Sequence, residues 1–142
     1  MDDASAIRDL VDAYARLADR RDAAGQAALF TADARVEVYE GDAAEPAQVV
    51  DGRADLAESF GVLRNYERTT HFNGQSTVSV DGDRATGEAY CLAHHLWTED
   101  GQRFLMVMSI RYDDVFVRED GCWLFASRKL IIDWVDRRPS TP

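Results

Sequence analysis

Apolar residues recur at helical spacing in the first half of the chain and alternate in the second half. Residues 5 to about 21 carry one apolar face, which predicts an amphipathic helix built on Ile7, Leu10, Val11, Tyr14, Leu17 and Ala18. A short second helix is predicted over about 22–30 and a third over 54–63, with a strand at 35–39 and a loop at 41–48 between them.

Strands dominate from residue 71 onward. Alternating patterns predict strands at 77–80, 84–98, 103–118 and 122–135, joined by turns that contain Gly82, Gly101 and Gly121. Helices followed by an antiparallel meander predict an α+β fold with the helices packed on one face of the sheet. The length predicts one domain, residues 1–142, and residues 137–142 are expected to be a frayed tail.

The strand at 84–98 predicts a hollow on one face of the sheet. Side chains alternate between faces, so one row is small up to its last member: Gly87, Ala89, Cys91, Ala93 and His95. The opposite row is larger and half apolar, with Tyr90, Leu92 and Leu96, and a partner subunit would cover it. We therefore expect a homodimer or homotrimer assembled through the outer sheet face.

The two following strands supply further candidates for the wall of this pocket. One row contains Met106, Met108, Ile110 and Tyr112, and the other contains Ala126, Arg128, Leu130, Ile132 and Trp134. An arginine in an apolar row is unfavourable unless it pairs or meets an anion. Ordinary core packing is the alternative explanation for both rows, since methionines and aromatic residues mostly fill cores.

Charge and composition narrow the function classes. The formal net charge is −10, so nucleic acid and anionic membranes are poor partners. The acidic N-terminus lacks the pattern of a secretion signal, and no apolar run is long enough to span a membrane. Cys91 and Cys122 match no metal or redox spacing, which predicts two reduced core thiols in a cytoplasmic protein.

Three histidines are the candidates for proton transfer near neutral pH. His71 is expected just before a strand, at the rim of the sheet, where a lone histidine is more often structural than catalytic. His94 and His95 are adjacent and point to opposite faces, so they would not share a metal. No nucleotide-binding glycine loop, zinc motif or serine elbow is present. Helical spacing places Asp19 off the apolar stripe, on the surface.

Three motifs carry a resemblance to a known family. They are Ile7-x-Asp-Leu with Ala18-Asp-Arg-Arg, then Thr70-His-Phe-x-Gly followed by a Val-rich strand, and finally Asp120-Gly-x-Trp-x-Phe. The whole chain resembles the SnoaL-like branch of the nuclear transport factor 2-like superfamily. Within it, the chain looks most like scytalone dehydratase, bile acid 7α-dehydratase and hexachlorocyclohexane dehydrochlorinase. The resemblance implies a cone formed by a curved, mixed but mainly antiparallel sheet around three N-terminal helices.

The resemblance also implies a cofactor-free and metal-free site with an Asp-His pair, which falls on Asp19 and His71. It therefore contradicts the surface position that helical spacing gives Asp19, and it implies that the chain bends after the first helix. Together with the strand rows, it predicts a wall for the apolar substrate pocket made of Tyr14, Tyr66, Cys91, His95, Met108, Tyr112 and Arg128.

The expected reaction is a dehydratase-type elimination on a small apolar or cyclic substrate. His71 would remove a proton, and Tyr14, His95 or Arg128 would donate a proton or hydrogen bond. Polyketide cyclisation and ketosteroid-type isomerisation are alternative reactions for the same pair. A non-catalytic small-ligand-binding domain is the alternative from another class, since a fold does not imply a reaction.

Overall fold

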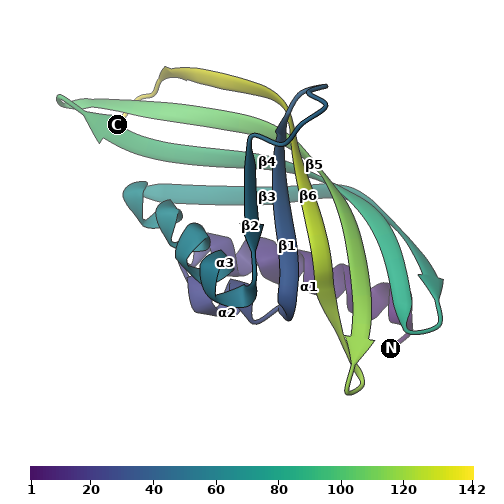
Figure 1. Ribbon diagram of the computed structural model, residues 1–142. Coiled ribbons are helices and arrows are strands. Elements are labelled where there is room, and N and C mark those ends of the chain that lie inside the picture. Colours follow the sequence, from purple (N-terminus) through teal and green to yellow (C-terminus); the bar gives the residue numbers. More distant parts are fainter.

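The computed structural model describes residues 1–142 (Figure 1). The helices are α1 (Asp3–Asp19), α2 (Ala23–Ala27) and α3 (Arg53–Phe60), and α3 continues into the 3₁₀ helix η1 (Gly61–Asn65). The strands are β1 (Phe30–Glu40), β2 (Gln48–Asp51), β3 (Arg68–Asp81), β4 (Arg84–Glu99), β5 (Gln102–Glu119) and β6 (Cys122–Pro139). No helix is both long and apolar enough to cross a membrane.

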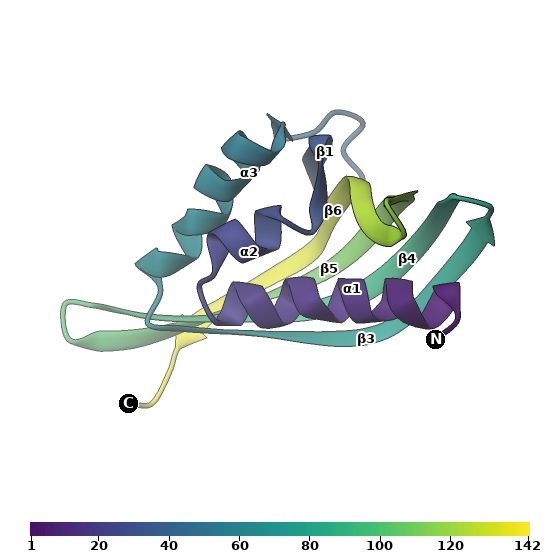
Figure 2. The ribbon, with the colours of Figure 1, turned by 90° about the horizontal axis from the view of Figure 1, so that it is seen from below.

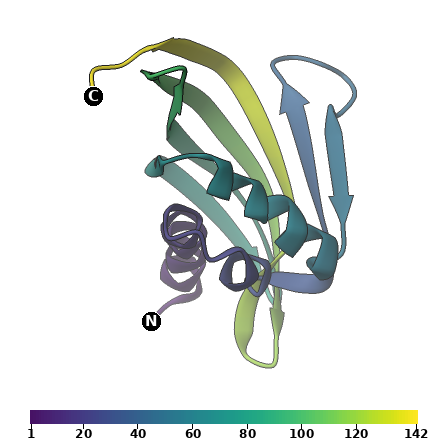
Figure 3. The same cartoon turned by 90° about the vertical axis from the view of Figure 1, so that its left-hand side faces the viewer.

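One six-stranded sheet runs in the order β2-β1-β6-β5-β4-β3. The β1–β6 pair is parallel and the other four pairs are antiparallel. The sheet curves strongly, and the three helices lie on its concave side (Figure 3). This confirms the predicted α+β fold with a mixed, mainly antiparallel sheet wrapped around helices. The cone is open, because β2 and β3 are edge strands that do not pair with each other.

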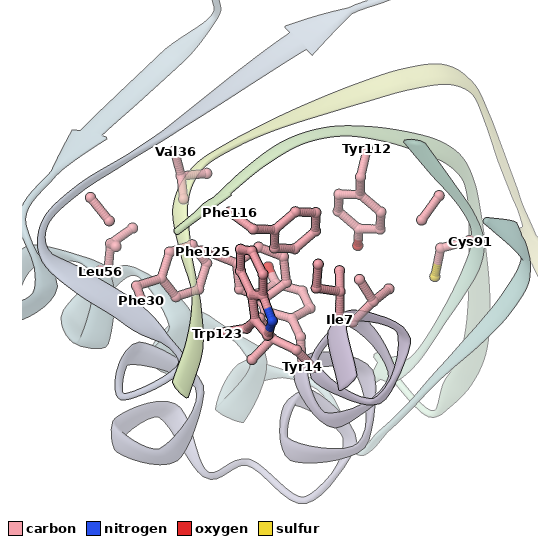
Figure 4. Packing of buried hydrophobic residues seen from close by; sticks show 14 of the residues in the cluster. Ile7, Tyr14, Phe30, Val36, Leu56, Cys91, Tyr112, Phe116, Trp123 and Phe125 are labelled. Carbon is pink, nitrogen blue, oxygen red and sulfur yellow. The ribbon is translucent and has the colours of Figure 1, made fainter. Parts of the chain in front are cut away.

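An aromatic cluster fills the space between α1 and the centre of the sheet (Figure 4). Phe30, Phe116 and Phe125 are fully buried, and the Phe30 and Phe125 rings stack with centroids 4.8 Å apart. Tyr14 brings the apolar face of α1 onto these rings, with its centroid 6.0 Å from that of Phe125. Burying one such side chain stabilises the fold by roughly 1.5–3 kcal/mol, so this cluster anchors α1 to the sheet.

The predicted turns are confirmed. Asp100-Gly101 and Asp120-Gly121 have positive φ at both residues, as a two-residue hairpin with the twist of its strands requires. The long strands β4, β5 and β6 lie where alternation placed them. The second helix is shorter than predicted, because the chain enters β1 at Phe30.

Three boundaries predicted from the sequence are wrong. β3 begins at Arg68, so His71 lies within a strand and not before it. β2 lies where the sequence indicated the end of a loop, because its four residues are held by pairing with β1. Residues 137–139 are not a frayed tail, because β6 continues to Pro139 opposite Phe104.

The two rows of β4 face as predicted. Ala89, Cys91 and Ala93 are buried on the concave face, whereas Tyr90 and Leu92 are exposed at 37% and 40%. The exposed outer row is the observation on which the predicted homo-oligomer depends, and the oligomer stays a prediction.

The inward-facing row predicted for β6 does not extend to Trp134. A bulge places Trp134 opposite Ser109 while Ile132 lies opposite Ile110, so Asp133 is the extra residue. Trp134 therefore points outward and is 52% exposed, against the prediction of an inward row. Cys122 is also exposed, against the prediction of two core thiols, because it is the first residue after a hairpin turn.

Candidate active site

Asp19 and His71 are in direct contact. Asp19 Oδ1 lies 2.7 Å from His71 Nδ1, and the main-chain N–H of His71 donates to Oδ2 at 2.9 Å. The Thr69 hydroxyl donates to Oδ1 at 3.1 Å. Three donors thus hold one carboxylate in place. The His71 side chain is 8% exposed and that of Asp19 is 27% exposed, so the pair lies at a boundary between core and solvent.

Asp19 reaches this position through regular helix geometry. α1 lies along the edge strand β3 (Figure 2), and one flank of the helix faces that strand. On this flank, Arg8 Nε contacts Ser76 Oγ at 3.5 Å, and the Asn73 amide donates to Asp12 Oδ1 at 2.9 Å. Asp19 continues the same flank, because residues 8, 12 and 19 share one side of a helix.

The bend that the resemblance implied therefore does not place Asp19. Asp19 is the last residue of α1, and Arg20 caps the helix. The chain reverses only afterwards: Arg21 has φ +57, and the main-chain N–H of Asp22 donates to Leu17 O at 3.0 Å. The surface position predicted from spacing was wrong because the flank beside the apolar stripe is covered by β3.

The environment of Asp19 favours its ionised form. Partial burial raises the pKa of this carboxyl, but the hydrogen bonds from the His71 ring and main chain outweigh it and lower the pKa below its usual value. An ionised carboxylate only accepts hydrogen bonds, so His71 Nδ1 carries the hydrogen. In the neutral ring, Nε2 is then the free acceptor. This is the arrangement of a histidine that can accept a proton.

A groove of about 410 Å³ opens between α1 and β3 beside this pair. Its lining residues are Asp12, Ala15, Arg16, Asp19, Arg20, His71, Phe72 and Asn73. Only two of these are hydrophobic, so the groove itself is polar. His71 lies on the concave face of the sheet, opposite the buried Ala93 of β4. No three His, Cys, Asp or Glu side chains form a group that would hold a metal ion.

Two predicted pocket residues lie next to His71 on that concave face. The His95 ring centroid is 6.0 Å from that of His71, and the Tyr66 ring is 4.8 Å from that of His95. Burial and then the nearby His71 lower the pKa of His95 to about 4, so its ring is neutral near pH 7. Its Nδ1 faces the Met106 carbonyl oxygen at 3.4 Å, which assigns the hydrogen to Nδ1 and leaves Nε2 as an acceptor. His95 therefore suits a hydrogen-bond acceptor and not the donor that the sequence suggested.

Arg128 is fully buried and paired with Asp114. Its Nε and Nη2 donate to the two Asp114 oxygens at 2.8 and 3.2 Å. The guanidinium carbon lies 3.5 Å from the ring centre of Tyr112 and 4.3 Å from that of Tyr14. Arg128 Nη1 is buried without a hydrogen-bond partner, so one donor remains for another group.

Sequence reasoning missed Asp114. The signal was present, because Asp114 continues the inward row of Met106, Met108, Ile110 and Tyr112 in β5. β5 and β6 place it directly opposite Arg128. An acid and a base at inward positions of adjacent antiparallel strands indicate a buried pair.

The remaining predicted pocket residues divide between two environments. Tyr14 and Tyr112 are buried in the aromatic cluster with ring centroids 6.0 Å apart, so side chains rather than a hollow occupy this part of the concave face. Cys91 is buried beside them, and burial raises the pKa of its thiol to about 11, which makes it a poor nucleophile. Met108 is only partly buried. Substrate contact by these four residues stays a prediction.

An open cone made of a curved six-stranded sheet with three helices on its concave side is the architecture of the nuclear transport factor 2-like class of α+β domains. Within that class, the chain belongs to the SnoaL-like domain family, whose family model matches residues 1–129.

Three proteins to which the chain is similar agree with this family. An uncharacterised protein of Mycobacterium tuberculosis is 28% identical over 124 residues, which cover 86% of this chain and 80% of that protein. A candidate scytalone dehydratase from Novosphingobium aromaticivorans superposes with a TM-score of 0.80 at 24% identity, covering 97% and 91% of the two chains. A hexachlorocyclohexane dehydrochlorinase from Novosphingobium barchaimii superposes with a TM-score of 0.76 at 20% identity, covering 96% and 89%. At these identities the two structures share the fold with this chain.

Proposed function

We propose that the chain is a cofactor-independent lyase that eliminates water, or a similar leaving group, from a small apolar or cyclic substrate. The contact between Asp19 Oδ1 and His71 Nδ1 at 2.7 Å carries this proposal, because it orients the ring and leaves Nε2 to accept a proton. The dehydratase and dehydrochlorinase names of structural neighbours agree with elimination chemistry.

His71 acts as the general base and Asp19 as its positioning partner. Nε2 removes a proton from a substrate carbon, and the electrons of that C–H bond form the new double bond. The bond from the neighbouring carbon to the leaving group breaks, and the imidazolium returns its proton to the departing hydroxide, which leaves as water. Asp19 stabilises the imidazolium while it exists.

The free donor of Arg128 is the candidate for stabilising negative charge on a substrate oxygen. Nη1 is fully buried and unpaired, and a donor kept from water acts strongly on a developing charge. The aromatic rings around it exclude solvent. Tyr14 lies against the same guanidinium and is the second candidate donor.

The base can be tested without the natural substrate. 5-Nitrobenzisoxazole loses a proton from carbon and opens to a coloured phenolate, so it reports a general base in an apolar site. We expect His71→Ala and Asp19→Asn each to lower the rate of this elimination by about 10²-fold while circular dichroism and Tm remain near the wild type. The matched controls are His94→Ala, on the opposite face of β4, and Asp9→Asn, on the exposed side of α1. Wild-type rates in His71→Ala would refute the proposal.

Product analysis distinguishes the reactions. On a panel of cyclic β-hydroxyketones, elimination lowers the product mass by one water, whereas isomerisation leaves the mass unchanged. Turnover with unchanged mass would reassign the pair to isomerase chemistry. Binding of the panel without turnover would favour a ligand-binding domain.

A further inference from the structure

The concave face continues past the Asp19–His71 pair as a row of aromatic rings. The His95 ring follows His71, Tyr66 contacts His95, and the Trp97 ring lies 6.0 Å from that of Tyr66. Phe104 then stacks on Trp97 with centroids 5.7 Å apart and an interplanar angle of 23°. The row reaches the β4–β5 hairpin, which projects past the helices together with the end of β6 (Figure 1).

The strand register confirms that these rings share one face. His95 lies opposite Met106 and Trp97 lies opposite Phe104, so both pairs belong to the inward rows of β4 and β5. Tyr66 precedes β3, and its ring contacts those of His95 and Trp97. The Arg21 guanidinium fixes the Tyr66 main chain by donating to its carbonyl oxygen. The row is thus a series of neighbouring rings that begins at the proposed base.

A cavity of about 240 Å³ lies at the outer end of this row. Its lining residues are Trp97, Glu99, Phe104, Arg137, Arg138 and Pro139. Glu99 is engaged, because its carboxylate accepts a hydrogen bond from Trp97 Nε1 at 2.9 Å. The cavity therefore combines flat aromatic walls with the Arg137 side chain and one carboxylate that is already hydrogen-bonded.

Arg137 is the arginine that faces the row. It lies opposite Met106 in the register of β5 and β6, and its Nε donates to Met106 Sδ at 3.3 Å. A thioether is a weak acceptor, and no carboxylate lies within 4.0 Å of this guanidinium. Arg128, the other inward arginine of β6, forms an ion pair with the Asp114 carboxylate. Arg138 lies opposite Leu105 and points to the other face.

We propose that this end of the concave face binds the carboxylate of a substrate whose flat, apolar ring system lies along Tyr66, Trp97 and Phe104, with Arg137 as the group that recognises the anion. This inference rests on the proposed function for its placement of the reacting carbon near His71. A planar guanidinium binds a carboxylate through two parallel hydrogen bonds, and the adjacent rings stack on a flat ligand. In a chain with a net charge of −10, the unpaired Arg137 guanidinium is the local positive charge that would allow an organic anion to approach.

Equilibrium binding tests the inference separately from catalysis. The probes are 2-naphthoate and its neutral analogue 2-naphthalenemethanol, titrated by calorimetry against the wild type, Arg137→Gln, Arg137→Lys and the control Arg84→Gln, which removes an exposed arginine at the opposite end of β4. We expect the wild type to bind 2-naphthoate about tenfold more tightly than the alcohol and Arg137→Gln to lose that preference. Arg137→Lys should retain part of it, and Arg84→Gln should retain it in full.

Three results would overturn the inference: equal affinities of the wild type for the two probes, a preserved preference in Arg137→Gln, or no saturable binding of naphthoate at millimolar concentration. An equal loss in Arg84→Gln would show a general charge effect, which also contradicts the inference. The Asp19→Asn variant should bind naphthoate as the wild type does. The binding result can therefore be interpreted even if the elimination assay fails, because it does not depend on catalysis.

Discussion

The pairs Asp114–Arg128 and Asp19–His71 both join an acid to a base beside the concave face, but they differ in their access to water. The Asp114 and Arg128 side chains are each 1% exposed and lie among aromatic rings. The Asp19 and His71 side chains are 27% and 8% exposed and border a groove. A fully buried pair must stay paired, because either charge alone would be costly, whereas a pair at a boundary can exchange a proton at small cost. The Asp114–Arg128 pair therefore stabilises the core and leaves only Arg128 Nη1 for another group, whereas the Asp19–His71 pair suits proton transfer.

The largest expected effect is the loss of one partner of the buried pair. Asp114→Asn leaves the Arg128 charge without its carboxylate, and we expect it to lower the free energy of unfolding by about 3–5 kcal/mol. Urea denaturation measures this change. Asp19→Asn is the matched variant, and we expect about 1 kcal/mol there, because water can replace part of what is lost.

A second variant keeps this prediction decisive if Asp114→Asn does not fold. Asp114→Asn combined with Arg128→Met removes both charges and should recover most of the lost stability. Equal losses in Asp114→Asn and Asp19→Asn would remove the distinction between the two pairs.

The next largest expected effect is the contribution of His95 to the pH dependence of the free energy of unfolding. Burial, followed by the nearby His71, lowers the pKa of His95 to about 4, below the value of 6.5 in an unfolded chain. Between pH 6.5 and 4 the unfolded chain therefore binds a proton at this histidine that the folded chain does not. The contribution of His95 to the free energy of unfolding is thus fully present above pH 6.5 and is lost as the pH falls towards 4. We expect this histidine to account for roughly 3 kcal/mol of that loss, because its side chain is buried and each pKa unit corresponds to about 1.4 kcal/mol.

His95→Gln should flatten the stability curve between pH 6.5 and 4 relative to the wild type, as followed by thermal unfolding in a series of buffers. His94→Gln, on the outer face, should leave the slope unchanged. An identical slope in the wild type and His95→Gln would show that the histidine beside the proposed base is not kept neutral by its surroundings.

The smallest expected effect tests how the boundary pair is held. Thr69→Val keeps the β-branched shape but removes the hydroxyl that donates to Asp19 Oδ1. We expect a loss of about 1 kcal/mol in stability and a fall of roughly threefold to tenfold in the elimination rate of 5-nitrobenzisoxazole. Thr70→Val, exposed on the opposite face, is the matched control. An unchanged rate in Thr69→Val would mean that His71 and the main chain position Asp19 without help.

Local pattern was sufficient for most of the fold. The helical face of α1, the two rows of β4 and the glycine turns follow from neighbours a few residues apart, which is why spacing predicted them. β2 was missed because its four exposed or half-buried residues gain their conformation from pairing with β1. Trp134 was misplaced because one extra residue, Asp133, shifts the alternation of β6, and the pattern carries no sign of that bulge.

For the site, the sequence by itself determined which side chains were available: an acid at the end of α1, three histidines, and an arginine in an apolar row. Their partners were decided only by the tertiary structure, since 52 residues separate Asp19 from His71 and 14 separate Asp114 from Arg128. The packing of α1 along an edge strand made the first contact, and the register of β5 against β6 made the second. Periodicity states which side a residue faces, whereas contact also requires knowing which element lies on that side.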